Sequence, residues 1–186
     1  RPEWTVSDVQ ARAGAIDEIT VHSAALGDER HVGVYVPARF RRSRHYPLLI
    51  VHDGFDYLRY ADLRVVLDNL IHRLEIPPLI AAFTQSPNRL EEYAGHDGHA
   101  RFVAIEIPEL LQHSFPLHPS PAARGLIGAS FGAVASLHAA WRHPGAFGRL
   151  ALQSGSFAFA DIGHHRRPST FDPVARFVNE FRRRPG

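Results

Sequence analysis

The residues with the clearest chemical potential are Gly128-Ala-Ser-Phe-Gly132, a serine flanked by two glycines. Residues 124–129 have the pattern of a short strand, and residues 131–143 that of a helix. A serine at such a strand-to-helix turn is held in a strained backbone conformation, with its hydroxyl exposed near the positive end of the helix. The glycines leave room for the neighbouring backbone. This context predicts Ser130 as a nucleophile; the alternative is a turn of small residues that only allows close packing.

A second segment offers donors for a developing negative charge. His52-Asp-Gly54 follows the apolar run 47–51, which is typical of a buried parallel strand. The backbone N–H of Gly54 or Phe55 could donate to a substrate oxyanion, together with the N–H of Phe131. The alternative is an ordinary turn that ends a strand.

The elements that must position these groups follow from hydrophobic periodicity. An antiparallel hairpin is expected from residues 16–22 and 30–36, and further strands from 47–51, 79–83, 124–129 and 149–153. Helices are expected over 60–74, 99–112 with a break or kink at Pro108, 131–143 and 171–184. This alternation predicts a single α/β domain over residues 1–186, with a mostly parallel sheet covered by helices on both faces and an N-terminal antiparallel hairpin.

Five blocks together resemble a known family. They occur in the family's order between about residues 17 and 160: Tyr46-Pro-Leu-Leu-Ile-Val-His-Asp-Gly54, Asn88-Arg-Leu-Glu-Glu-Tyr93, Gly128-Ala-Ser-Phe-Gly132, Arg142-His-Pro144 and Gln153-Ser-Gly-Ser-Phe157. The chain looks like the enterochelin-esterase-like branch of the esterase D family, which are α/β-hydrolases.

The resemblance implies a serine carboxylic-ester hydrolase with Ser130 as nucleophile and the Phe131 backbone as an oxyanion donor. It implies no metal or organic cofactor. The expected partner is a small-molecule ester, first a siderophore trilactone and alternatively a feruloyl or acetyl ester of a carbohydrate. A rival of another class is a non-catalytic hydrolase-like protein that has lost its triad.

The sequence departs from this family after the serine. Its 56 remaining residues (186 − 130) have the pattern of helix, strand, loop and helix. The family's acid and histidine follow later strands, so both are expected beyond residue 186, with the C-terminal strands missing from this chain. Without a base, the chain alone is expected to be nearly inactive. Asp161, His164 and His165 are possible substitutes, but their basic surroundings favour a solvated polar loop.

Composition excludes several classes. The absence of cysteine excludes disulfide scaffolds and thiolate chemistry. A net charge of +2, with 19 acidic residues among 21 arginines, argues against a nucleic-acid partner. Arginine without lysine is typical of a G+C-rich bacterial genome. The absence of a long apolar run predicts no membrane association and a cytoplasmic location.

Two polar segments have competing interpretations. His96-Asp-Gly-His99 has a spacing conceivable for a metal ligand pair, but no further ligands at fixed spacing accompany it, which favours a polar loop. Arg89 and Glu92 are expected to brace the loop after the strand at 79–83; alternatively Arg89 faces an anionic or catecholate substrate. The arginines within 39–44 and 182–184 are expected to be solvated.

Overall fold

The chain was analysed as a computed structural model that describes residues 3–160 and 165–185. The described residues form one six-stranded sheet in the order β1-β2-β4-β3-β5-β6. Its strands are β1 (Ala15–Ser23), β2 (Asp28–Val36), β3 (Leu48–Val51), β4 (Ile80–Thr84), β5 (Arg124–Ala129) and β6 (Arg149–Gln153). The pairs β1–β2 and β2–β4 are antiparallel, and the other pairs are parallel. The predicted hairpin and mostly parallel sheet are therefore confirmed.

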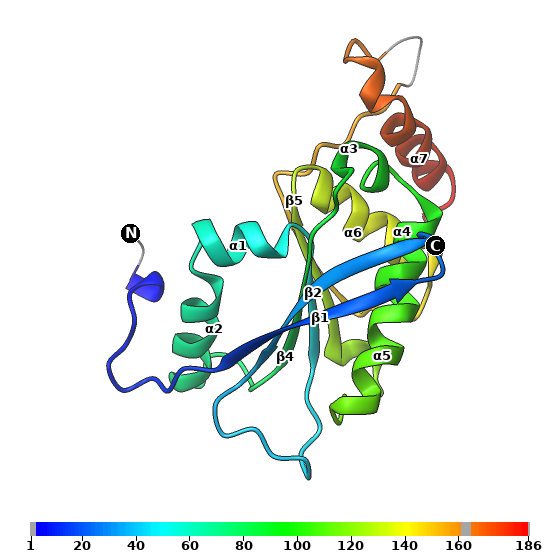
Figure 1. Ribbon diagram of the computed structural model, residues 1–186. Coiled ribbons are helices and arrows are strands. Elements are labelled where there is room, and N and C mark those ends of the chain that lie inside the picture. The colour runs from blue at the N-terminus through cyan, green and yellow to red at the C-terminus, as the bar shows by residue number, and fades with distance from the viewer. Residues whose placement is uncertain (1–2, 161–164, 186) are drawn as a thin grey trace.

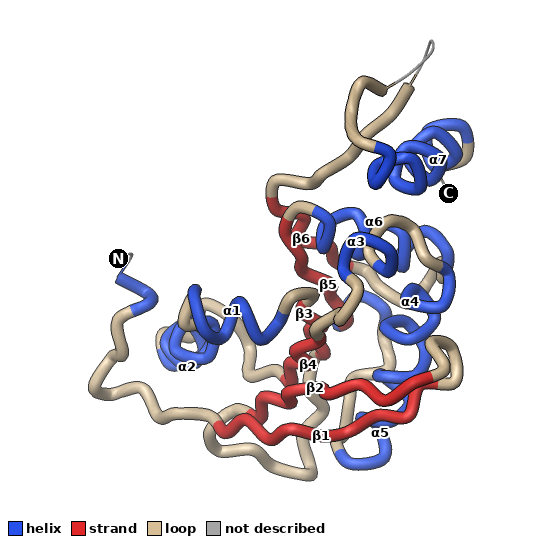
Figure 2. The backbone as a smooth tube through the Cα atoms, turned by 45° about the horizontal axis from the view of Figure 1, so that its top comes forward, coloured by secondary structure: helices blue, strands red, loops and turns tan. Residues whose placement is uncertain are grey.

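Helices lie on both faces of the sheet. The α-helices are α1 (Gly54–Tyr60), α2 (Leu63–His72), α3 (Arg89–Glu92), α4 (Asp97–Arg101), α5 (Ile107–Ser114), α6 (Phe131–Arg142) and α7 (Asp172–Arg183). Short 3-10 turns occupy Glu3–Thr5, Pro121–Ala123 and Ser169–Phe171. The pair α1 and α2 lies on one side of the sheet, and α4, α5 and α6 lie on the other (Figures 1 and 2).

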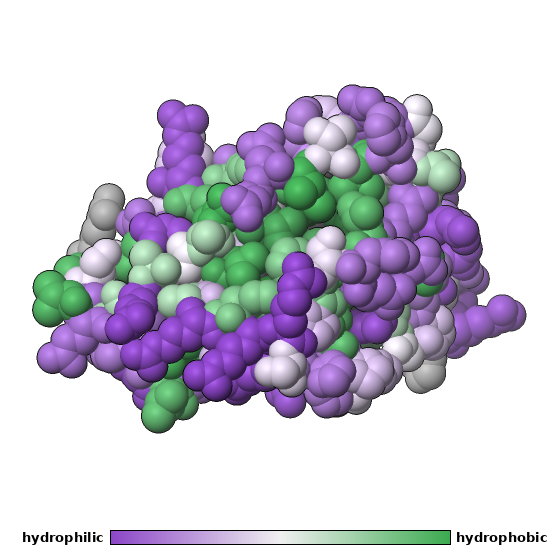
Figure 3. Space-filling model, turned by 60° about the horizontal axis from the view of Figure 1, so that its bottom comes forward, coloured by the Kyte–Doolittle hydropathy of each residue, from purple (hydrophilic) through white to green (hydrophobic). Residues whose placement is uncertain are grey.

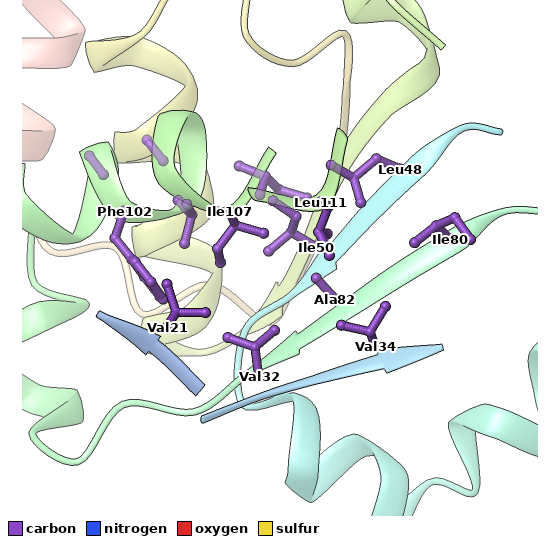
Figure 4. Packing of buried hydrophobic residues seen from close by; sticks show 14 of the residues in the cluster. Val21, Val32, Val34, Leu48, Ile50, Ile80, Ala82, Phe102, Ile107 and Leu111 are labelled. Carbon is purple, nitrogen blue, oxygen red and sulfur yellow. The ribbon is translucent and has the colours of Figure 1, made fainter. Parts of the chain in front are cut away.

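The core follows from alternation along the central strands. Leu48 and Ile50 of β3 pack in one cluster with residues of the segment that leads into α5, whereas Val51 packs in a second cluster with Leu67 of α2. Figure 4 shows the first cluster, where β-strand side chains meet Phe102, Ile107 and Leu111. Successive strand residues point to opposite faces, so runs that are apolar throughout fill both layers.

The helix expected over 60–74 is wrong in its bounds. Two helices occupy this region: α1 starts directly after β3, and α2 begins only at Leu63. Asp62 between them has φ 50°, a left-handed conformation that a continuous helix cannot contain. The apolar stripe belongs to α2, while α1 is too short to show a period of its own.

The segment expected as a kinked helix over 99–112 is irregular before its proline. A π-helical turn, Phe102–Glu106, joins α4 to α5, and Pro108 lies in the first turn of α5. A proline ring collides with the carbonyl four residues earlier and provides no N–H. Widening the preceding turn removes this collision, which explains why the irregularity lies before Pro108.

One of the two edge strands of the sheet, β6, is exposed along its whole length. All five of its residues are exposed, including Leu150 and Leu152.

Apolar side chains also gather on the face viewed in Figure 3, in an area bordered by strongly hydrophilic residues. Within the described part of the chain, no helix combines the length and the apolar character needed to cross a bilayer.

Candidate active site

Ser130 lies at the strand-to-helix turn that the sequence predicts. It joins the end of β5 to the start of α6 and has φ 56° and ψ −115°. A non-glycine residue with this backbone is strained, and its neighbours hold it there. The Ser130 N–H donates to the Gln153 carbonyl at 2.9 Å, and the Ser130 carbonyl accepts from the Ser156 N–H at 3.1 Å. Both backbone polar groups of Ser130 are thus bound to the end of β6 and the segment that follows it.

The two glycines of the turn have different neighbours. A Cβ at Gly128 would collide with the backbone of Gly132. At Gly132, a Cβ would lie 3.2 Å from the His52 Cβ and 3.3 Å from the Asp53 carboxylate. The second glycine therefore lets α6 approach the loop after β3. This close approach brings the Phe131 N–H, the first of α6 and one without an intrahelical acceptor, to the same sheet edge as that loop.

The loop after β3 turns at Asp53 and not at the neighbouring glycine. Asp53 has φ 53° and ψ 37°, whereas Gly54 begins α1. Gly54 is needed for space, since a Cβ there would lie 2.5 Å from Phe83 in β4. The Asp53 N–H donates to the Tyr93 hydroxyl at 3.2 Å, which leaves the N–H groups of Gly54 and Phe55 as the loop's candidate oxyanion donors.

Arg89 connects the two segments just described. Its Nε donates to both carboxylate oxygens of Asp53 at 2.9 Å, and its Nη2 donates to the Ala129 carbonyl at 3.1 Å and lies 2.9 Å from Asp53 Oδ2. The guanidinium also lies over the rings of Tyr93 and Phe131. Burial lowers the pKa of Arg89, but the hydrogen bonds and charge of Asp53 outweigh it, and the net shift is upward. Arg89 thus links the loop after β4 to the loop after β3 and to Ala129, the residue before Ser130, and these partners differ from the brace that the sequence predicts.

Two residues that the sequence analysis gave no role lie at the same edge. The Ser156 hydroxyl is 2.6 Å from the Ser130 hydroxyl, and the Tyr57 hydroxyl of α1 donates to the Gln153 side chain. Burial raises the pKa of Tyr57, with a smaller contribution from Asp53. The only signal for Ser156 was its place in the block 153–157.

A cluster of buried polar side chains lies next to the loop after β3. His52 and His99 are both buried, with ring centroids 5.2 Å apart, and burial lowers the pKa of each. The His52 Nδ1 is 3.0 Å from the Ser136 hydroxyl of α6. Glu92 forms a bidentate pair with Arg30 of β2. Burial opposes the charge of Glu92, but the neighbouring His99 ring at 3.6 Å and the hydrogen bonds from Arg30 lower its pKa to about 2.

The polar loop expected at residues 96–99 is wrong in part. The His96 Nδ1 accepts from the His99 N–H, and Asp97 contacts Arg142 and His138. Residues 97–101 are helical because this cap and its neighbours hold them, and His99 turns into the core. Among the described residues, no three His, Cys, Asp or Glu side chains come together as metal ligands.

The expected solvated loop near residue 165 also needs correction. The His165 side chain is 7% exposed, and its Nε2 lies 2.8 Å from the Asp172 carboxylate at the start of α7. Asp172 belongs to the next α-helix along the chain. The basic residues that flank His165 in the sequence therefore gave no sign of this contact. Asp161 and His164, the other candidate substitutes for the acid and base, lie outside the described residues.

Comparison with known proteins defines the class. Residues 23–181 match the model of the Esterase family, described as "Putative esterase", and the chain belongs to this family. Two uncharacterized Bacillus subtilis proteins are similar in sequence: YjcH at 28% identity over 76% of this chain, and YbbA at 24% over 77%. The chain spans 62% and 64% of their lengths.

Solved structures give the same fold. The enterochelin esterase of Shigella flexneri matches with a TM-score of 0.79 and 22% identity, over 98% of this chain and 44% of that protein. The same enzyme with 2,3-dihydroxy-N-benzoyl-glycine matches at 0.70 and 25% identity, over 80% and 38%. The ferulic acid esterase AmCE1/Fae1A of Anaeromyces mucronatus matches at 0.72 and 17% identity, over 94% and 72%. The expected α/β-hydrolase fold and esterase branch are confirmed.

Proposed function

We propose that this esterase acts through an acyl-enzyme formed at Ser130. The observation that carries the proposal is the strained serine between β5 and α6, with its hydroxyl beside the N-terminus of a twelve-residue helix. The Ser130 oxygen attacks the ester carbonyl, and its proton passes to a base. The Phe131 N–H and that of Gly54 or Phe55 hold the oxyanion. The alcohol then leaves with the proton, and water releases the acid from Ser130 in a second step.

The base and acid are proposed to lie beyond residue 186. The relatives are longer than this chain, and a serine without a base is a poor nucleophile. Residues 1–186 alone are therefore expected to be nearly inactive, and each activity test below uses the longest form in which the protein occurs, here called full-length.

The first substrate proposed is a siderophore trilactone. Its support is the structural likeness to an enzyme solved with a dihydroxybenzoyl ligand, and Arg89 beside Ser130 as a cation that could meet a catecholate. The Arg89 side chain is 34% exposed, so a ligand can reach it. A feruloyl or acetyl ester of a carbohydrate is the second candidate, favoured by the likeness to a ferulic acid esterase. Fold likeness alone does not decide between them.

A serine-directed fluorophosphonate tests the nucleophile. The full-length protein should be labelled, and Ser130→Ala should not. The matched control is Ser156→Ala, because Ser156 lies 2.6 Å from Ser130 and a probe that reacted with the wrong serine would be detected there. Loss of labelling in Ser156→Ala but not in Ser130→Ala would contradict the assignment. An unlabelled, folded full-length protein would favour the non-catalytic rival.

The substrate is tested separately. Purified protein is incubated with a catecholate trilactone and with methyl ferulate, and products are followed by mass spectrometry. Preferential opening of the trilactone supports the first candidate, and release of ferulate supports the second.

A further inference from the structure

We infer that Arg89 is a positioning residue that aligns the two halves of the oxyanion site. This inference rests on the proposed function, and it gives Arg89 a role beyond contact with substrate. The residue before each proposed donor segment is bound by one guanidinium: Asp53, which precedes Gly54, and Ala129, which precedes Ser130 and Phe131.

The first step of the argument is strain. Asp53 and Ser130 both have positive φ, at 53° and 56°. Such conformations persist in non-glycine residues only where surrounding contacts impose them. The Asp53 carboxylate receives both Arg89 Nε and Nη2, and its backbone N–H is held by Tyr93. Arg89 is thus the side chain that keeps Asp53 turned, and the direction of the Gly54 N–H follows from that turn.

The second step is geometry at the nucleophile. Arg89 Nη2 donates to the carbonyl of Ala129, the last residue of β5. Because the guanidinium is planar and rigid, its contacts with Asp53 and Ala129 fix the distance between the two loops. Its contacts with the Tyr93 and Phe131 rings restrict it further. A small displacement of catalytic groups can cost about 100-fold in rate.

The third step is charge. The Asp53 side chain is 9% exposed and lies beside the place where a negative oxyanion would form. Alone, this carboxylate would repel the transition state, since charges interact strongly at low solvent exposure. The Arg89 charge compensates it. A lysine would keep the charge but could not make the same set of directed contacts.

The test measures kcat and KM of full-length Arg89→Gln, Arg89→Lys, Asp53→Asn and the double variant Arg89→Gln/Asp53→Asn. The substrates are neutral p-nitrophenyl acetate and anionic p-nitrophenyl succinate, with active sites titrated by fluorophosphonate so that rates refer to folded enzyme. Arg142→Gln is the matched control, because it breaks another arginine–aspartate pair, with Asp97, away from the site.

A positioning role predicts that Arg89→Gln lowers kcat by about 10- to 100-fold for both esters, with little change in KM. Arg89→Lys should recover only part of this loss, and Arg142→Gln should change neither constant. The double variant should be more active than Arg89→Gln, because it no longer leaves Asp53 uncompensated. An effect confined to the KM of the anionic ester would overturn the inference and leave Arg89 as a substrate-binding residue.

Failure of the proposed function is distinguishable from failure of this inference. A wild-type protein that hydrolyses neither ester and takes up no probe contradicts the proposed function. The positioning role is then tested by hydrogen exchange, which should be faster for the amides of residues 54–56 in Arg89→Gln but not in Arg142→Gln. Unchanged exchange would overturn the inference.

Discussion

At the scale of single residues, the site depends on Gly128, a position where a side chain has no room. At Gly128 any Cβ would meet the Gly132 backbone, which cannot rotate away as a side chain can. The other glycine of β5, Gly125, has its nearest neighbour, the Leu49 side chain, at 3.5 Å. The same strand therefore provides both a crowded glycine and a tolerant one.

Gly128→Ala should therefore destabilise the protein by about 1–3 kcal/mol, the usual cost of overpacking, whereas Gly125→Ala should cost much less. Urea unfolding followed by circular dichroism measures both. Equal midpoints for the two variants would show that the turn can relax.

A buried histidine makes stability depend on pH. Burial lowers the pKa of His138 in α6 from 6.5 to about 4, although the Asp97 carboxylate opposes the shift. In the unfolded chain His138 therefore binds a proton as the pH falls through about 6.5, whereas in the folded protein it does so only near pH 4. Stability is full above pH 6.5 and is lost as the pH falls through this window, by roughly 3 kcal/mol at 1.4 kcal/mol per pH unit.

The measurement is the free energy of unfolding between pH 7 and pH 4.5. His138→Gln should reduce its slope, with the rest due to His52 and His99, whose pKa values burial also lowers, while His22→Gln, at an 81% exposed histidine, should leave it unchanged. Glu92, with a pKa of about 2, acts below this range, because its contribution is lost only as the pH falls below 4.5. An unaltered slope in His138→Gln would contradict the assignment.

At the scale of elements, a buried ion pair joins the N-terminal hairpin to α3. The Arg30 side chain of β2 and the Glu92 side chain of α3 are 7% and 9% exposed, and their nitrogen–oxygen contacts are 2.7 and 2.8 Å. α3 also carries Arg89 at its first residue. The pair therefore anchors the short helix from which the site is braced.

Removing one partner should cost more than removing both. Glu92→Gln is expected to destabilise the fold, because Arg30 loses its buried countercharge, but by less than the roughly 3–5 kcal/mol of a fully uncompensated charge, since Arg30 keeps its pair with Asp28 at 2.6 Å. Arg30→Met/Glu92→Leu should be less destabilising than the single changes suggest when summed. A double-mutant cycle by chemical unfolding checks this, and additive costs would contradict it.

The elements also show what the sequence could predict. The strands and the serine turn follow from local signals, namely apolar runs and a glycine pattern. The start of α2 could not be predicted in this way, because Asp62 adopts a left-handed conformation that the hydrophobic periodicity does not indicate. Arg89 could not be assigned to Asp53 and Ala129, which are 36 and 40 residues away along the chain. His99 was misjudged because burial depends on packing against residues distant in sequence.

At the scale of the whole molecule, the sheet of the described residues has two edge strands, β1 and β6, and β6 is the one that exposes large apolar side chains, Leu150 and Leu152. Unpaired backbone groups and exposed leucines on an edge strand favour association with other chains. Residues 1–186 produced as a fragment should therefore self-associate through β6, and Leu150→Lys/Leu152→Lys should reduce this. Sedimentation velocity measures it. Leu90→Lys, at a 50% exposed leucine of α3, is the control and should have no effect; an equal effect would exclude β6 as the contact.

The hydrogen bonds between Ser130 and the β6 end of the sheet have a consequence for the thermal inactivation of the proposed enzyme. The amide and carbonyl of Ser130, the proposed nucleophile, are bound to Gln153 and Ser156, so local unfolding of this margin would release the serine. Heat would then abolish turnover before the hydrophobic layers melt. Contacts that stabilise this margin, such as those of the further strands proposed beyond residue 186, would therefore slow thermal inactivation without any change to the interior.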